Sequence, residues 1–320
     1  TITSGIYTGG LNVVKSEEGS TLTINGGTFT RTTAPRWGVT GTVLVYGTTT
    51  ITGGTFNEKS TSPNARVVVT GRVDGYNSVT YINGGTFNGN GNNVLHYLNP
   101  AQADDSFEIS GGTFNKSIPD YYCADGFIPT KNADGTYGVK EGSYVAETNG
   151  TKYESLQAAI DAAGKNATVT MLADTRENVT IANAMTLDLN GFTLNGGTVA
   201  GKPALTITAR TVTIKDSSTA QNGTIMREDT AENSGVSSHY VIDIQGNAWV
   251  MFESGNVKNG SGVVGVKGAS LVRVGDDSVD KYPGLNIKGG TFTQDNFIVI
   301  KVDRGDLFLN GGTLNSANTY

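Results

Sequence analysis

A repeated Gly-Gly-Thr-Phe motif constrains the fold of this chain more than any other feature. Full copies begin at Gly26, Gly53, Gly84, Gly111 and Gly289. Looser copies begin at Ser4, Gly196, Asn222, Ser254 and Gly311. The copies form two arrays, in which successive starts lie 22, 27, 31 and 27 residues apart and then 26, 32, 35 and 22 residues apart. Such spacing predicts an array of one small structural unit.

The shortest spacing, 22 residues in both arrays, predicts what that unit is. It suits one coil of three short strands and three bends, and the longer spacings suit the same coil with a loop added. A propeller blade is longer and an α-solenoid repeat is helical. A leucine-rich repeat needs a regular Leu and Asn skeleton that the sequence lacks. We therefore predict an all-β fold, a right-handed parallel β-helix (β-solenoid) with coils marked by the motif.

The composition agrees with many short strands joined by tight turns. The chain has 44 Gly among 320 residues and 16% charged residues, against usual shares of about 7% and about 25%. The polar residues are mostly Thr, which favours strands, and Asn and Ser, which favour turns. Cys123 is the only cysteine, so the fold has no intramolecular disulfide.

Strand alternation around the motif predicts which side chains face the core. The residue two positions before the first glycine is apolar in most copies and is expected to face inward. The same rule places these further residues inside: Leu22, Phe107, Phe192, Val250, Leu285 and Leu307. The ring that ends the motif is expected to stack from coil to coil at about 4.8 Å. That column contains Phe29, Phe56, Phe87 and Phe114.

The two arrays predict two β-helical blocks rather than one uninterrupted stack. We expect a first array over 1–117, a closing hairpin and linker over 118–150, and a second array over 151–320. The second array begins with a capping helix at 154–163, because apolar residues recur there at helical spacing. Ser155 is placed to cap the start of this helix and Gly164 to end it.

Several segments are similar to a known family. They are 153–163 (Tyr-Glu-Ser-Leu-Gln-Ala-Ala-Ile-Asp-Ala-Ala), 168–174, 187–191, and the upstream stretches 109–114, 122–126 and 134–137. Together they resemble a module common in large surface proteins of Gram-positive gut bacteria. The resemblance implies a pectate-lyase-like β-helix in an adhesin-like protein, extracellular and either attached to the cell wall or secreted. It carries over no catalytic residue.

Charge and hydropathy exclude several classes of partner. The net charge is −6 and there is no run of Lys or Arg, so we expect no nucleic acid partner. No apolar run approaches the ~20 residues of a membrane span, so we expect no membrane insertion. The sequence opens at Thr1 in a strand-like pattern and stops at Tyr320 just after a repeat, so we expect both ends to be cut from something longer.

The preferred function is a non-catalytic module of a bacterial cell-surface protein, for adhesion, ligand binding or spacing. Host or bacterial glycans or surface proteins are its expected partners. One alternative is a carbohydrate-active enzyme, a polysaccharide lyase or hydrolase, because the predicted fold also hosts such activities. A second alternative is a trimeric protein like a phage tailspike, which binds bacterial polysaccharide.

One acidic cluster could carry chemistry. Asp276, Asp277 and Asp280 follow a strand-like run, and they fit a solvated loop, a calcium site or a catalytic pair. Calcium is the single cofactor under consideration. A hydrolase would need two carboxylates that face each other across a groove, which adjacent strand residues do not. Asp104 and Asp105 form a weaker case of the same kind.

Other candidate groups favour structural interpretations. Arg273 and Lys301 are positioned as bases for a lyase only by their place in the chain. His96, His239 and Cys123 lack a catalytic context. Asp188 and Asn190 are expected at a bend or in an outward ladder. Thr-x-Thr stretches raise an ice-binding interpretation, but the unequal coil lengths argue against a flat threonine array.

Outward-facing aromatic residues are the strongest binding signal. Alternation predicts that Trp249, Tyr81 and Phe308 point away from the core, where large rings bind sugars or partners. For Trp249 there are two interpretations. The preferred one is that the segment 226–240 covers the ring, and the other is that the ring contacts a ligand.

Overall fold

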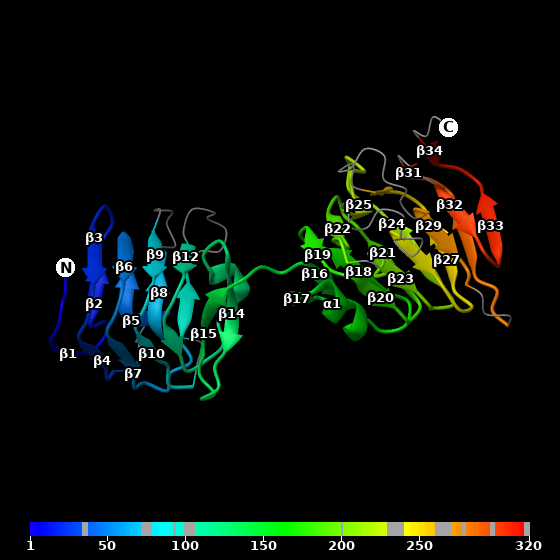
Figure 1. Ribbon diagram of the computed structural model, residues 1–320. Coiled ribbons are helices and arrows are strands. Elements are labelled where there is room, and N and C mark those ends of the chain that lie inside the picture. Colours follow the sequence, from blue (N-terminus) through cyan, green and yellow to red (C-terminus); the bar gives the residue numbers. More distant parts are fainter. Residues whose placement is uncertain are drawn as a thin grey trace. The chain divides into compact units, whose positions relative to one another are not determined.

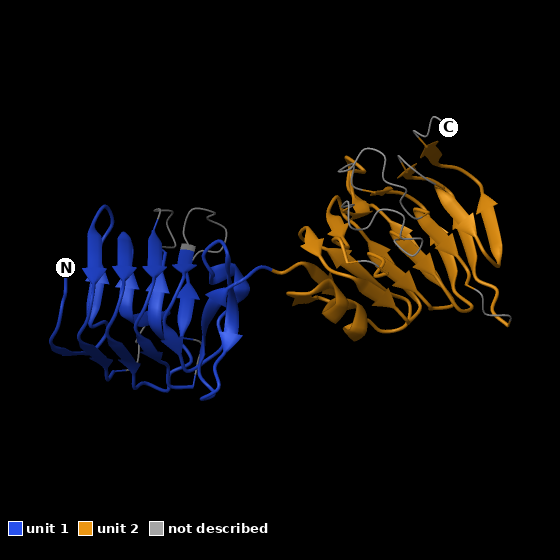
Figure 2. Ribbon diagram, in the orientation of Figure 1, with its two compact units in different colours: residues 1–143 blue, residues 144–320 orange. Residues whose placement is uncertain are grey.

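The chain forms two compact units in the computed structural model, Thr1–Ser143 (unit 1) and Tyr144–Tyr320 (unit 2) (Figure 2). The structure describes residues 1–33, 38–71, 78–91, 94–98, 106–199, 201–228, 240–259, 270–276, 280–294 and 298–316. Each unit has its own cluster of buried apolar residues. The boundary between the units lies inside the segment 118–150 that the sequence assigns to hairpin and linker.

Unit 1 consists of stacked coils that each place one strand in each of three parallel sheets (Figure 1). The first sheet contains β1 (Ile6–Gly9), β4 (Thr28–Arg31), β7 (Thr55–Glu58), β10 (Thr86–Asn88) and β13 (Thr113–Phe114). The second contains β2 (Val14–Ser16), β5 (Thr40–Val45), β8 (Ala65–Thr70) and β11 (Leu95–Tyr97). The third contains β3 (Thr21–Ile24), β6 (Thr48–Ile51), β9 (Val79–Ile82) and β12 (Ser106–Ile109). Neighbouring strands within a sheet are three apart in sequence order, which is compatible with a β-helix.

A single column of aromatic rings runs through unit 1, as predicted. Phe29, Phe56, Phe87 and Phe114 are fully buried, and successive ring centroids lie 4.9 Å apart with nearly parallel planes. The glycine before each Thr-Phe pair supplies the bend, as at Gly54, whose φ of 107° lies in the region that glycine favours. The motif is therefore a packing device that repeats once per coil.

An antiparallel hairpin covers the last coil of unit 1. Its strands are β14 (Phe127–Lys131) and β15 (Tyr137–Glu141), and β15 pairs with β13 through Phe114 and Tyr137. The turn between the strands is held by the carboxylate of Asp134, which accepts a 2.9 Å hydrogen bond from the amide of Thr136. A short 3₁₀ helix, η1 (Asp120–Tyr122), precedes the hairpin. The open edge of the first sheet is thus paired at this end.

Unit 2 repeats the three-sheet plan. One sheet contains β17 (Thr151–Tyr153), β16 (Ala146–Thr148), β18 (Ala167–Met171), β21 (Met185–Asp188), β24 (Val212–Lys215), β27 (Trp249–Phe252), β30 (Gly284–Ile287) and β33 (Asp306–Leu309). The second contains β19 (Thr175–Arg176), β22 (Thr193–Asn195), β25 (Thr224–Arg227), β28 (Asn256–Asn259), β31 (Thr291–Gln294) and β34 (Thr313–Ser316). The third contains β20 (Val179–Ile181), β23 (Leu205–Ile207), β26 (Ile242–Ile244), β29 (Val272–Val274) and β32 (Ile300–Val302). All pairs are parallel except those of β16 with β17 and with β18.

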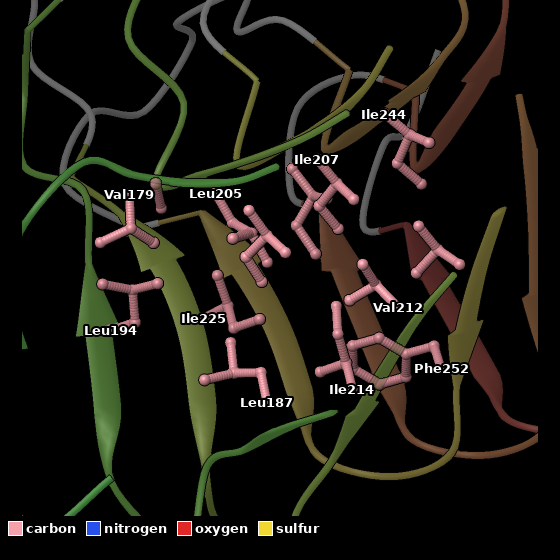
Figure 3. Packing of buried hydrophobic residues seen from close by; sticks show 14 of the residues in the cluster. Val179, Leu187, Leu194, Leu205, Ile207, Val212, Ile214, Ile225, Ile244 and Phe252 are labelled. Carbon is pink, nitrogen blue, oxygen red and sulfur yellow. The ribbon is translucent and has the colours of Figure 1, made fainter. Parts of the chain in front are cut away.

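The core of unit 2 is mainly aliphatic. Figure 3 shows side chains from the three sheets, among them Leu187, Leu205 and Ile225, pointing toward one another between the sheets. The single α-helix among the described residues, α1 (Leu156–Ala162), packs Leu156 and Ile160 against the first coil. The helix is shorter than the predicted range 154–163, but Ser155 caps its start as predicted, because Ser155 Oγ accepts a hydrogen bond from the amide of Ala158.

Some inward positions carry polar side chains, which the sequence analysis did not predict. Arg31 stands two residues after the stacked Phe29, is fully buried, and forms an ion pair with Glu58 of the next coil. Arg227 occupies the matching position in unit 2 and is also fully buried. It donates hydrogen bonds to the backbone carbonyls of Val199 and Tyr240. Buried polar groups are tolerated when they are paired in this way.

Leu309, a predicted core position, is exposed at the last coil of unit 2, as is Leu314, which ends a looser copy of the motif. Leu309 and the motif residue Leu314 belong to β33 and β34, which are the final strands of their sheets. The alternation rule gives their direction correctly, but no further coil within the described residues lies against them. The exposure of Leu309 corrects the expectation that it is buried.

Candidate functional site

Trp249 points outward from the sheet, as predicted. On β27 the alternate residues Val250 and Phe252 are buried, whereas 39% of the surface of Trp249 is exposed. The segment 226–240, proposed as its cover, falls mostly outside the described residues. The described residues leave part of the Trp249 ring exposed, and both interpretations of the residue remain predictions.

A glycine on the neighbouring strand leaves the space that the Trp249 ring occupies. Trp249 and Gly284 are register partners in β27 and β30. A Cβ atom added to Gly284 would lie 2.4 Å from Trp249 Cζ3, so the indole lies directly over this glycine. The ring thereby reaches Phe308 on β33, with ring centroids 5.7 Å apart. The surface of Trp249 is 39% exposed and that of Phe308 is 43% exposed. We call these two residues the aromatic platform.

A groove of about 480 Å³ borders the platform, lined by Arg210, Thr211, Asn247, Trp249 and Tyr282. Tyr282 is 64% exposed, and its amide donates a 3.2 Å hydrogen bond to Asn247 Oδ1. Arg304 packs against the Tyr282 ring with its guanidinium carbon 4.9 Å from the centroid. The groove therefore combines exposed rings with amide, hydroxyl and guanidinium groups.

Tyr81, the third predicted contact residue, does not join the platform. It belongs to β9 of unit 1, where it lies in register with Thr50 and Glu108. Its side chain faces outward as predicted and 40% of its surface is exposed. The structure thus brings together Trp249 and Phe308 but leaves Tyr81 on the other unit.

The acidic cluster is only partly visible. Asp277 lies outside the described residues, as do Asp104, Asp105 and His239. Asp276 and Asp280 flank the undescribed stretch. Within the described part of the chain, no group of three His, Cys, Asp or Glu residues is arranged to hold a metal ion. A calcium site at this cluster therefore remains a prediction.

Arg273 and Lys301 are neighbours, but their electrostatics oppose a role as bases. They are register partners in β29 and β32. Arg273 makes two hydrogen bonds to Asp243, of 2.8 and 2.6 Å, and this pairing raises the pKa of Arg273. Asp303 Oδ1 lies 2.8 Å from Lys301 Nζ, and this carboxylate likewise raises the pKa of Lys301. A catalytic base of this type needs a lowered pKa.

The remaining candidates have structural surroundings. Burial raises the pKa of Cys123 to about 11, so its thiol is unreactive at neutral pH. The buried carboxylate of Asp188 accepts hydrogen bonds from the amides of Asn190 and Ser217. Asn190 has a φ of 48° and donates a 3.0 Å hydrogen bond to the carbonyl of Met171. Asp188 and Asn190 therefore hold a bend.

Comparisons with protein-family models, curated proteins and solved structures find no match for this chain. None of the described helices has the length and apolar character needed to cross a membrane. The functional argument therefore depends on the geometry of the site.

Sequence reasoning missed Gly284, Tyr282 and Asn247. A signal for Gly284 is nevertheless present, because Gly284 and Trp249 both stand five residues before their motif copies at Gly289 and Ser254. Aligning the copies would have placed the glycine beside the indole.

Proposed function

We propose that this chain is a non-catalytic, glycan-binding module of an extracellular bacterial surface protein, built from two right-handed parallel β-helices. The observation that carries the proposal is the aromatic platform, two exposed rings in contact across β27 and β33. The resemblance to adhesin-like modules supports the extracellular location.

The platform suits a saccharide because a pyranose has an apolar C–H face and a rim of hydroxyl groups. An aromatic ring offers an apolar surface to the C–H face. The adjoining groove is lined by Arg210, Thr211 and Asn247, which offer hydrogen-bond donors and acceptors to the hydroxyl groups. The groove volume of about 480 Å³ falls in the usual range for small ligands, about 300–1,000 Å³.

Tryptophan fluorescence provides the test, since the chain has only two tryptophans. In a Trp37→Phe background, the emission reports on Trp249 alone. We expect titration with a panel of bacterial and host glycans to change this emission for at least one glycan. In the otherwise native chain, Trp249→Ala should remove the contribution of the platform to binding of that glycan and leave the melting temperature nearly unchanged.

Tyr81→Ala is the matched control, because it removes an exposed ring of similar size from unit 1. It should leave binding of that glycan intact. Equal binding by Trp249→Ala and the native chain would overturn the proposal. New reducing ends or unsaturated uronate absorbance in the same mixtures would favour a hydrolase or a lyase instead.

A further inference from the structure

Unit 1 has a groove of its own beside β11. Its volume is about 500 Å³, and its described lining comes from residues 94–97 on one side and from residues 117–119, 121 and 122 on the other. Val94, Leu95 and Ile118 are buried at its base. The groove therefore joins the edge strand of the second sheet to the segment around η1.

An exposed ring stands at this groove on a rigid support. Tyr121 is 74% exposed, and its ring meets Tyr122 edge to face with centroids 4.7 Å apart. Tyr122 in turn meets the buried ring of Phe107 at 4.7 Å. Tyr121 thus presents an apolar surface whose neighbour is anchored in the core. Such a residue is preorganised for contact with a ligand.

The described residues that line the groove carry no charge near neutral pH, and Asp120 of η1 is not among them. The described lining residues include no Lys, Arg, Asp or Glu. Burial lowers the pKa of His96, and the nearby charge of Arg66 lowers it further, so the imidazole is neutral and offers one donor and one acceptor. Burial also raises the pKa of Tyr122 to about 12, which keeps the phenol protonated.

We propose that this groove is a second binding site, specific for an uncharged saccharide. The exposed face of Tyr121 matches the C–H face of a neutral pyranose, and the imidazole and phenol groups match its hydroxyls. An acidic sugar would lose the hydration of its carboxylate without meeting a cation among the described lining residues. The platform groove of unit 2 differs, since Arg210 lines it. The proposal stands on unit 1 alone and holds whether or not the platform binds a glycan.

The test uses the full chain carrying Trp249→Ala, so that the platform makes no contribution. Because the chain has two histidines, the imidazole proton signals of His96 and His239 can be separated by proton NMR, and His239→Asn assigns them. We expect a neutral tetrasaccharide, tested as cellotetraose, mannotetraose and β-1,4-galactotetraose, to shift the His96 signal. Trigalacturonate should leave it unchanged.

Tyr121→Ala should weaken that binding by about tenfold, as loss of one aromatic contact would. Because Tyr121 is so exposed, the unfolding midpoint should not change. Tyr282→Ala in unit 2 is the matched control and should bind like its parent. The proposal is overturned if none of the three neutral tetrasaccharides shifts the His96 signal, if trigalacturonate binds equally well, or if Tyr121→Ala retains full affinity.

Discussion

The carboxylate of Glu177 accepts a 2.8 Å hydrogen bond from the amide of Leu156, the first residue of α1. It also accepts hydrogen bonds from the amide of Gln157 and the hydroxyl of Ser155. The first amides of a helix have no partner within the helix, and its N-terminus favours a negative charge. Glu177 follows β19, so one carboxylate joins the capping helix to the first coil of unit 2.

This carboxylate should make the stability of unit 2 depend on pH. Burial alone would raise the pKa of Glu177, but hydrogen bonds from Thr175, Leu156 and Ser155 outweigh it and hold the pKa below 4.5. A lowered folded-state pKa gives stability that is complete above the unfolded-state value and is lost as pH falls toward the folded value. Glu177→Gln should cost about 2 kcal/mol at pH 7 and flatten the profile below pH 4.5, as measured by urea unfolding. The exposed Glu253→Gln should do neither.

Removal of one ring from the stacked column should destabilise unit 1 strongly. Phe56 lies between Phe29 and Phe87 and is fully buried. Phe56→Ala should lower the free energy of unfolding by about 3–5 kcal/mol, through lost apolar contact and the cavity left behind. Far-ultraviolet circular dichroism during urea unfolding measures this loss. A loss below 1 kcal/mol would contradict the packing described above.

Gly284→Ala should disturb the platform only while Trp249 is present. The new methyl group would lie 2.4 Å from the indole, so the ring must leave Phe308. We expect weaker glycan binding and altered Trp249 emission. In a Trp249→Ala background, Gly284→Ala should cost little further stability, which gives a coupling of about 0.5–3 kcal/mol in a double-mutant cycle. Additive effects of the two substitutions would contradict the contact.

Replacement of one partner of the buried ion pair in unit 1 should destabilise the unit more than replacement of both partners. Arg31 is paired with Glu58 and also donates a 2.9 Å hydrogen bond to the carbonyl of Leu11. Arg31→Met leaves the Glu58 carboxylate buried without its cation and should cost about 3–5 kcal/mol. Arg31→Met combined with Glu58→Leu should recover part of that loss. Thermal unfolding of these two variants and of the native chain measures the effect, and a double variant less stable than Arg31→Met would refute the prediction.

The aromatic column could be predicted because its members share one residue type, one motif and one alternation rule. Phe29 and Phe114 lie 85 residues apart in the sequence, yet each follows its own double glycine. Alternation alone therefore gives the inward direction, and the motif gives the alignment between coils. The capping helix was predictable for a similar local reason. Its cap residue, Ser155, and the helical spacing of Leu156 and Ile160 lie within one short segment of the sequence.

The buried arginines and the platform depend on information that alternation does not contain. The rule assigns Arg31 an inward direction, but a buried charge needs a partner, and that partner is Glu58 at the register position in the next coil. Contact between Trp249 and Phe308 depends on the register across β30 and on the absence of a side chain at Gly284. Both are relations between coils rather than within one strand.

The hydrogen bonds between coils have a mechanical consequence. The amide of Thr55 donates to Gly27, that of Thr86 to Gly54 and that of Thr113 to Gly85, so each bond links one coil to the next. Tension between the first and last coils of unit 1 acts along these bonds and opens the outermost row first. The unit should therefore yield under load by peeling one coil at a time, and each released coil would lengthen the tether and absorb work before the next row is strained.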